Sequence, residues 1–214
     1  MKRFFATVSA VALLGAPAAS KPGQWTRIFD GRSLKGWTPK ISGRAVGDNY
    51  LDTFQVRNGA IRVSYTRYNK GFDGRFGHLA FKRPLSAFRV RFDYRFYGST
   101  LKGVENWQYS NSGIMLLGQD PASMTRDQKF PVSLEMQLLG AERPEPTPTG
   151  NLCTPGTNVV LHGKLETTHC ITSSSPIIAN GRWVHAEALV TPDGQVAHDI
   201  DGVPVMAYSA PQYD

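Results

Sequence analysis

The sequence predicts an all-β protein built as an antiparallel β-sandwich or jelly roll. Glycine (21) and proline (14) are abundant among the 214 residues, and no stretch carries a long apolar stripe at helical spacing. Several segments alternate apolar and polar residues with a period of two, as strands with one solvated face do. Asn58-Gly59 and Asp201-Gly202 interrupt such segments, and these pairs favour tight hairpin turns.

The first twenty residues have the three parts of a secretory signal peptide. A basic start is followed by an apolar run too short to cross a bilayer comfortably, and then by the small residues Ala16-Pro17-Ala18. We therefore expect residues 1–20 to be removed on export to the periplasm or the extracellular space. A retained N-terminal anchor is the alternative. Residues 25–214 then form a single domain without a stable membrane span.

The net charge of +7 does not indicate a nucleic-acid partner. The basic residues are scattered along the chain, and no block of lysine and arginine with interleaved aromatic residues occurs. The sequence therefore predicts no nucleic-acid binding.

Four segments show the alternation most clearly, and each is expected to form one strand or a hairpin. They are FRVRFDYRF (88–96), VSLEMQLLG (132–140), WVHAEALV (183–190) and QVAHDIDGVPVMAY (195–208). The segment NSGIMLLG (111–118) reads as a buried strand that begins with hydrogen-bonding side chains.

Two cysteines, Cys153 and Cys170, flank a loop-rich stretch. In an exported protein a disulfide between them is the default expectation. Free thiols are one alternative. A zinc site that uses His162 and His169 is another, although the spacing fits no structural zinc pattern.

Glu135 and Gln137 are the clearest candidates for a ligand site. They stand two residues apart on one predicted strand, so their side chains project from the same face. A carboxylate and an amide together suit sugar hydroxyls, and Glu135 can also serve as a general base. The alternative is an ordinary solvent-facing pair.

Three further residues each allow a structural and a functional interpretation. His198 lies in mid-strand between apolar neighbours, where a histidine is more often a hydrogen-bonded core residue than a catalytic one. Arg95 either covers a solvated face or binds a ligand. Trp107 either stacks on a sugar ring or packs in the interior.

Several motifs together resemble the 3-keto-disaccharide hydrolase family, also described as 3-keto-glucoside 1,2-lyase and 3-keto-2-hydroxy-glucal hydratase domains. The resemblance starts at Ile28 and runs to the end of the chain. It is carried by IFDGRSLKGW (28–37), NSGIMLLG, LEMQLLG, the cysteine-containing GNLCTPGTNVVLHGKLETTHC (150–170) and HDIDGVPVMAY (198–208). In the last of these, Asp201 stands where the family usually has asparagine.

The resemblance implies a concanavalin A-like sandwich of two curved antiparallel sheets with a sugar groove on the concave face. It also implies that the family's last strands are absent from this chain, so that an unpaired edge or an exposed apolar strip is expected. Asn111 and Ser112 would enter the groove from the edge of a core strand. Gly113 would allow close approach, and Glu135 and Gln137 would line the same groove.

The implied activity is cleavage of 3-keto-glycosides by removal of the C2 proton and elimination at C1, with hydration as a following step. Glu135 and His198 are the expected base and acid, in an order that the sequence does not assign. Trp107, Asn111, Gln137 and Arg95 would bind the carbohydrate. No cofactor is certain, a divalent metal stays open, and the oligomeric state is not predicted. The alternatives are a lectin-like module and an ordinary glycoside hydrolase on the same sandwich.

Overall fold

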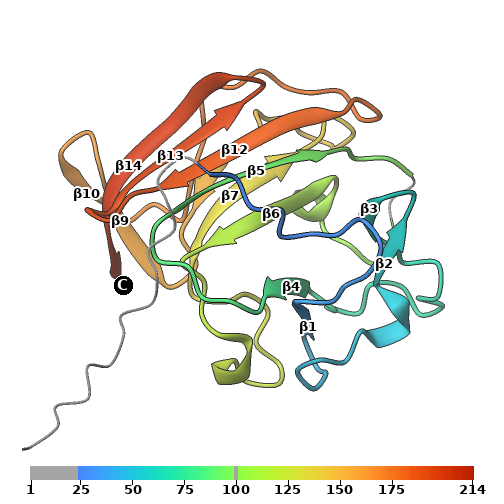
Figure 1. Ribbon diagram of the computed structural model, residues 1–214. Helices are drawn as coiled ribbons and strands as arrows, with labels where there is room; N and C mark the ends of the chain where they lie inside the picture. Colours follow the sequence, from blue (N-terminus) through green and yellow to red (C-terminus); the bar gives the residue numbers. More distant parts are fainter. Residues whose placement is uncertain (1–23, 99–100) are drawn as a thin grey trace, which may run out of the picture.

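The protein is an antiparallel β-sandwich of two main sheets, as the sequence predicts. The computed structural model describes residues 24–98 and 101–214 (Figure 1). The larger sheet has the order β10 (Lys164–Glu166), β9 (Thr157–Leu161), β14 (Val203–Tyr213), β13 (Gln195–Ile200), β12 (Val184–Val190) and β5 (Phe88–Tyr94). The smaller sheet has the order β11 (Cys170–Ile171), β8 (Asn151–Cys153), β7 (Leu134–Leu139) and β6 (Asn111–Leu116).

Two short ribbons and three single-turn helices complete the described structure. The ribbons pair β1 (Trp37–Ile41) with β4 (Gly77–Phe81) and β2 (Phe54–Arg57) with β3 (Ala60–Val63). The 3-10 turns are η1 (Tyr50–Asp52), η2 (Asn106–Gln108) and η3 (Pro121–Ser123). In Figure 1 the ribbons lie below and to the right of the two main sheets.

The core lies between the two main sheets and is built from alternate residues of their strands. Leu134, Met136 and Leu138 of β7 are buried, and they share one apolar cluster with Ala186 and Ala188 of β12. The polar residues between them face away from this cluster. The period of two therefore predicts correctly which side of each strand is apolar.

The Asn-Gly and Asp-Gly pairs form the predicted hairpin turns. Asn58 and Gly59 both have positive φ (50° and 77°) between β2 and β3, and Asp201 and Gly202 (52° and 80°) do the same between β13 and β14. Positive φ at both central residues matches the twist of the flanking strands.

His198 belongs to the core and not to a groove, and this corrects the expectation from sequence. Its side chain is wholly buried on the inner face of β13. The ring Nδ1 lies 3.0 Å from the carbonyl oxygen of Gly150, so it donates, and Nε2 lies 3.0 Å from the hydroxyl of Tyr208. Burial lowers the pKa of His198 to about 4, so the neutral ring accepts the Tyr208 proton at neutral pH.

One side of the sandwich is open. Within the described residues β5 pairs only with β12, and β6 pairs only with β7. Both are therefore edge strands, and the apolar side chains of Phe88 and Phe92 on β5 are only partly buried. The expectation that further strands of the family fill this side stays a prediction.

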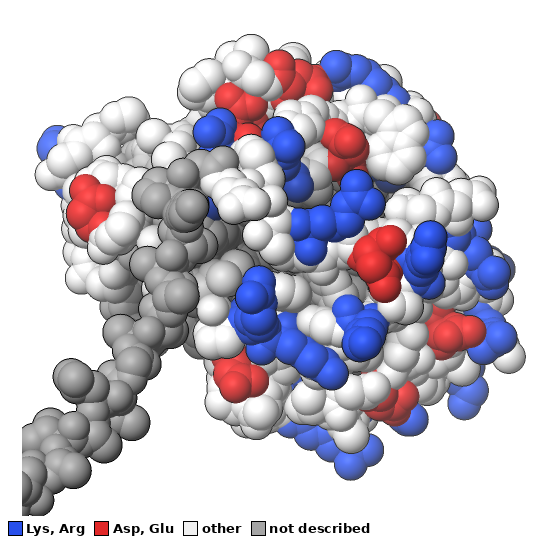
Figure 2. Space-filling view, viewed as in Figure 1, with Lys and Arg blue, Asp and Glu red and all other residues white. Residues whose placement is uncertain are grey.

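The predicted signal peptide, residues 1–20, lies outside the described residues, so its cleavage stays a prediction. No helix among residues 24–98 and 101–214 is long and apolar enough to cross a bilayer. Lysine and arginine side chains are spread over the visible face with acidic residues between them (Figure 2).

The buried hydrogen bonds of His198 predict a large effect of its removal on stability. His198→Ala leaves a cavity and two buried polar partners unsatisfied, and should lower the free energy of unfolding by about 3 kcal/mol. Denaturant unfolding monitored by circular dichroism measures this loss. His162→Ala, in the exposed turn between β9 and β10, is the control and should change the free energy little. Equal stability of wild type and His198→Ala would contradict the prediction.

Candidate functional site

The outer face of the smaller sheet carries two rows of side chains on the floor of a large open groove. Residues paired across neighbouring strands point to the same side, so the register defines each row. The first row consists of Gly113, Gln137 and Asn151. The second row consists of Met115, Glu135, Cys153 and Cys170. All seven residues line the groove.

The absence of a side chain at Gly113 leaves space for the carboxylate of Glu135. A Cβ atom added at Gly113 would collide with Oε1 of Glu135 and lie 2.7 Å from its Cγ. The carboxylate therefore leans across β6 over the backbone of Gly113. This close approach explains why the third residue of this core strand has no side chain.

Glu135 is a desolvated carboxylate without a compensating partner. None of the hydrogen bonds or ion pairs formed by residues 24–98 and 101–214 involves its oxygens. Burial raises the pKa of Glu135 to about 7. A carboxylate with such a pKa exchanges protons readily at neutral pH, which suits a general base.

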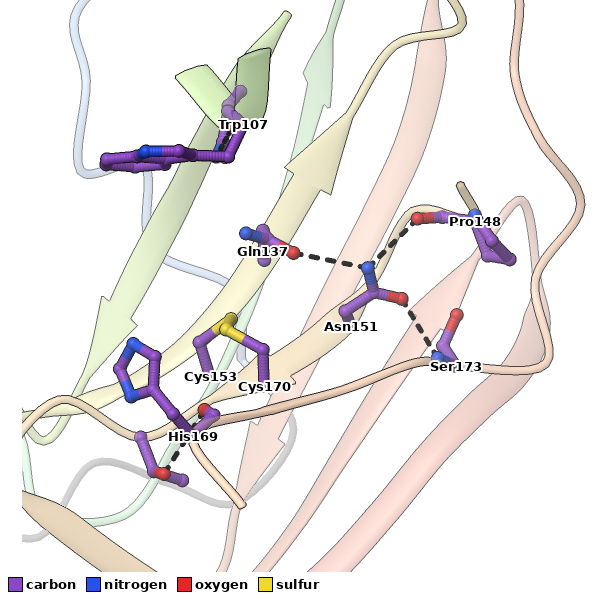
Figure 3. Close-up of a disulfide and its surroundings, with 10 residues drawn as sticks. Trp107, Gln137, Pro148, Asn151, Cys153, His169, Cys170 and Ser173 are labelled. Carbon is purple, nitrogen blue, oxygen red and sulfur yellow. Dashed lines mark hydrogen bonds between the residues drawn. A yellow bond between two sulfur atoms is a disulfide. The ribbon is translucent and has the colours of Figure 1, made fainter. Parts of the chain in front are cut away.

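Two amide side chains lie in the row beside Glu135. Asn151 donates through Nδ2 to Oε1 of Gln137 (3.2 Å) and to the carbonyl oxygen of Pro148 (3.0 Å), and its Oδ1 accepts from the amide of Ser173 (2.9 Å; Figure 3). Asn151 is thus fixed, and it fixes Gln137 with the Nε2 amino group directed away from Asn151. The sequence analysis missed Asn151, although its position two residues before Cys153 places both on one face.

The predicted disulfide between Cys153 and Cys170 is confirmed. The two residues are direct partners on β8 and β11, with Cα atoms 4.1 Å apart. The bridge lies in the same row as Glu135, so it forms part of the groove floor. It also makes both sulfur atoms unavailable as zinc ligands, and the part of the chain that the structure describes contains no group of three or more potential metal-binding side chains.

His169 is a titratable residue on the groove that sequence reasoning considered only as a zinc ligand. Its carbonyl oxygen accepts a hydrogen bond from the amide of Thr154 (2.8 Å), which holds the backbone next to Cys170. Its imidazole lies beside the disulfide (Figure 3) and lines the groove. The signal in the sequence was its position next to a cysteine that faces the site.

Asn111 and Trp107 are linked at the start of β6. The Nδ2 group of Asn111 donates to the carbonyl oxygen of Trp107 (2.9 Å). The indole of Trp107 is 43% exposed and lies parallel to the ring of Phe76, with centroids 5.8 Å apart. Trp107 therefore presents a ring face to the groove.

Ser112 and Arg95 do not share the face that carries Glu135. Ser112 pairs with Leu138, so it points to the inner side of β6. Arg95 follows β5 on the outer face of the larger sheet, where its guanidinium lies 4.7 Å from the ring centre of Trp183. The alternation of the strands places both side chains on other faces than that of Glu135, although both residues belong to the lining of the groove. Their assignment as carbohydrate ligands stays a prediction.

Comparison with known proteins identifies the family. The model of the 3-keto-alpha-glucoside-1,2-lyase-like domain matches residues 24–214. The chain belongs to this family. The resemblance carried by the sequence motifs is thereby confirmed, and family membership indicates a carbohydrate-active protein.

A solved structure supports the fold. It comes from Parabacteroides distasonis ATCC 8503, and that protein is considered a glycosyl hydrolase. The TM-score is 0.50 at 18% sequence identity, with 86% of this chain and 71% of the other chain covered. The search among curated proteins found no match.

The disulfide predicts a measurable loss of stability on its removal. The bridge closes a loop with a sequence separation of 17, for which the chain-entropy model gives about 3 kcal/mol. The double variant Cys153→Ala/Cys170→Ala should lose about that amount in free energy of unfolding under non-reducing conditions. Wild type in reducing buffer is the matched control and should move toward the variant. A variant as stable as oxidised wild type would contradict the prediction.

The raised pKa of Glu135 predicts how Glu135→Gln changes stability with pH. Because the folded-state pKa lies above the ordinary value of 4.5, the contribution of Glu135 to stability is full below that value and is lost as the pH rises through about 7. Glu135→Gln should therefore gain stability relative to wild type with rising pH, by up to about 3 kcal/mol above pH 7. Denaturant titrations at acidic and basic pH measure this gain. A difference that stays constant with pH would contradict it.

Proposed function

We propose that the protein cleaves 3-keto-glucosides by elimination, with Glu135 as the base that removes the proton from C2. The observation that carries the proposal is the Glu135 carboxylate itself. It lies on the groove floor of a protein of this family, it has no hydrogen-bond or ionic partner among the described residues, and burial raises its pKa to about 7.

The proposed reaction requires a base close to C2 of the sugar. A ketone at C3 acidifies the neighbouring C2–H bond, and Glu135 takes the proton while the electron pair forms the enolate. The enolate then expels the substituent at C1, whose oxygen leaves with the bonding electrons and takes up a proton. A C1–C2 double bond results, and addition of water across it completes a net hydrolysis.

The enolate oxygen needs a hydrogen-bond donor that is oriented in advance. The Nε2 group of Gln137 suits this role because Asn151 holds the other end of the same amide, at Oε1. Asn111 at the start of β6 and Trp107 in η2 suit the binding of sugar hydroxyls and of a ring face.

The departing oxygen needs a proton donor. His198 does not supply it, because its ring is buried between the sheets. His169, whose imidazole lines the groove beside the disulfide, takes this role in the proposal. The disulfide itself supports the proposal that the protein works outside the cytoplasm, in the periplasm or the extracellular space.

The proposal predicts a selective loss of turnover in Glu135→Gln. The substitution keeps the size of the side chain and removes the base, so kcat on a 3-keto-glucoside should fall by about 10²-fold or more with a smaller change in KM. Below the pKa of Glu135 the base is protonated, so wild-type kcat/KM should rise with pH through about 7. Release of the C1 substituent measures both effects.

Controls separate the alternatives. Glu166→Gln, on the short strand β10 away from the groove, should keep wild-type activity. Wild type should cleave the 3-keto-glucoside and leave the unoxidised glucoside intact, since only the ketone acidifies C2. Equal cleavage of both would favour an ordinary glycoside hydrolase. Binding without cleavage of either would favour a lectin-like module.

A further inference from the structure

A second cavity adjoins the groove at the end where Trp107 stands. Its volume is about 240 Å³. Four aromatic side chains line it: Phe72, Phe76, Trp107 and Phe130. All four also line the groove, so the two spaces share these walls.

The rings surround the cavity from several directions. Phe76 lies at the centre of the cluster, with its ring centre 4.9 Å from Phe72 at 89° and 4.8 Å from Phe130 at 52°. Trp107 lies parallel to Phe76 at 5.8 Å. A guest in this cavity would therefore meet both ring faces and ring edges. Planar aromatic molecules pack well in such an arrangement, since ring faces are negative and ring edges positive.

Three residues of the wall already satisfy one another's polar groups. The indole Nε1–H of Trp107 donates to Oε2 of Glu105 (2.8 Å), and the amide of Glu105 donates to Oε1 of Gln108 (2.6 Å). The Glu105 side chain also accepts from the backbone of Gln108, which completes a capping box around η2. A sugar would need such groups for its hydroxyls. Their internal use leaves the four rings, together with the ammonium of Lys129 at 5.8 Å from the ring centre of Phe76, as the contacts open to a guest.

The wall formed by Phe130 is held in place from behind. His78 on β4 donates through Nε2 to the carbonyl oxygen of Lys129 (2.7 Å). The buried Lys40 on β1 donates through Nζ to the carbonyl oxygen of Arg126 (2.9 Å). These bonds tie the loop before Phe130 to the β1–β4 ribbon. The cavity is therefore organised before a ligand arrives, which reduces the entropy lost on binding.

We infer that this cavity binds a planar aromatic group carried at C1 of the sugar, so that the substrates are aryl glycosides. The inference rests on the proposed function for the orientation of the sugar, whose ring would lie over Glu135 with the C1 substituent toward Trp107. Elimination then breaks the bond between C1 and the phenolic oxygen, and the phenol leaves with one proton. A phenol departs more readily than an aliphatic alcohol because its oxygen holds negative charge better.

The first test compares the affinities of the protein for several unoxidised glucosides. These compounds bind without undergoing the elimination. Phenyl glucoside, methyl glucoside and cellobiose are titrated into the full chain by calorimetry, with both anomers of the first two. We expect phenyl glucoside to bind about 10-fold or more tightly than methyl glucoside. In Trp107→Ala and in Phe130→Leu, the ratio of the affinities for phenyl and methyl glucoside should fall to about 3 or less.

Tyr213→Ala is the matched control. It removes another exposed aromatic side chain, at the end of β14, which lines neither the cavity nor the groove, and it should keep the wild-type ratio of affinities. Circular dichroism confirms that each variant is folded. Equal binding of phenyl and methyl glucoside, or no measurable binding of phenyl glucoside at millimolar concentration, would overturn the inference. Cellobiose that binds as tightly as phenyl glucoside, with the same dependence on Phe130, would overturn it by identifying a second sugar site.

Turnover distinguishes failure of this inference from failure of the proposed reaction. With phenyl and methyl 3-keto-glucosides, Trp107→Ala should reduce kcat/KM for the phenyl substrate about 10-fold more than for the methyl substrate. Equal reductions would count against the aromatic site while leaving elimination intact. Phenyl selectivity in binding without turnover of either keto-glucoside would sink the proposed reaction and leave the aromatic site standing.

Discussion

The alternation of side chains along β7 is the constraint on which the site depends. Leu134, Met136 and Leu138 must face the larger sheet, because the core lies there. Glu135 and Gln137 must then face the groove. A shift of one residue in register would bury the carboxylate in the core and expose the three apolar side chains. The packing energy of the core therefore fixes the direction in which the carboxylate points.

The groove floor holds in place a group that the fold disfavours when it is ionised. Desolvation of Glu135 costs free energy whenever the carboxylate is ionised, and the described residues supply it with no cation. The cross-strand disulfide lies in the same row and ties β8 to β11. The hydrogen bonds of Asn151 fix the next row. Rigid neighbours keep the carboxylate desolvated, and desolvation keeps its pKa near neutrality.

The local pattern of the sequence is enough to predict the strands and their faces. The alternation in residues 132–140 and 183–190 separates the buried side chains from the others, and the Asn-Gly and Asp-Gly pairs mark their turns. Cys153 and Cys170 were paired correctly because two cysteines in a chain that is expected to be exported leave few alternatives. The strands and turns depend on residues close in sequence, and the disulfide depends only on whether the two cysteines pair.

The sequence does not reveal which sheet a strand joins, and this limits the prediction of the site. His198 and Glu135 both lie in mid-strand, yet β13 turns its histidine toward the space between the sheets while β7 turns its glutamate away from it. The apolar neighbours Val196 and Ile200 already indicated a core position for His198. The faces taken by Arg95 and Ser112 were open for the same reason, since a period of two defines two faces without saying which one meets the core.

The aromatic cavity is the part of the site furthest from any local pattern. Its rings come from residues 72–76, 107 and 130, and the loop that carries Phe130 is held by hydrogen bonds to β1 and β4. Such an assembly exists only after the ribbons and the smaller sheet have come together. Asn111 joins it to the groove floor, because it begins β6 and holds the carbonyl of Trp107. The polar start of β6 thus links two spaces: the row with the Glu135 carboxylate and the rings that would receive the group at C1.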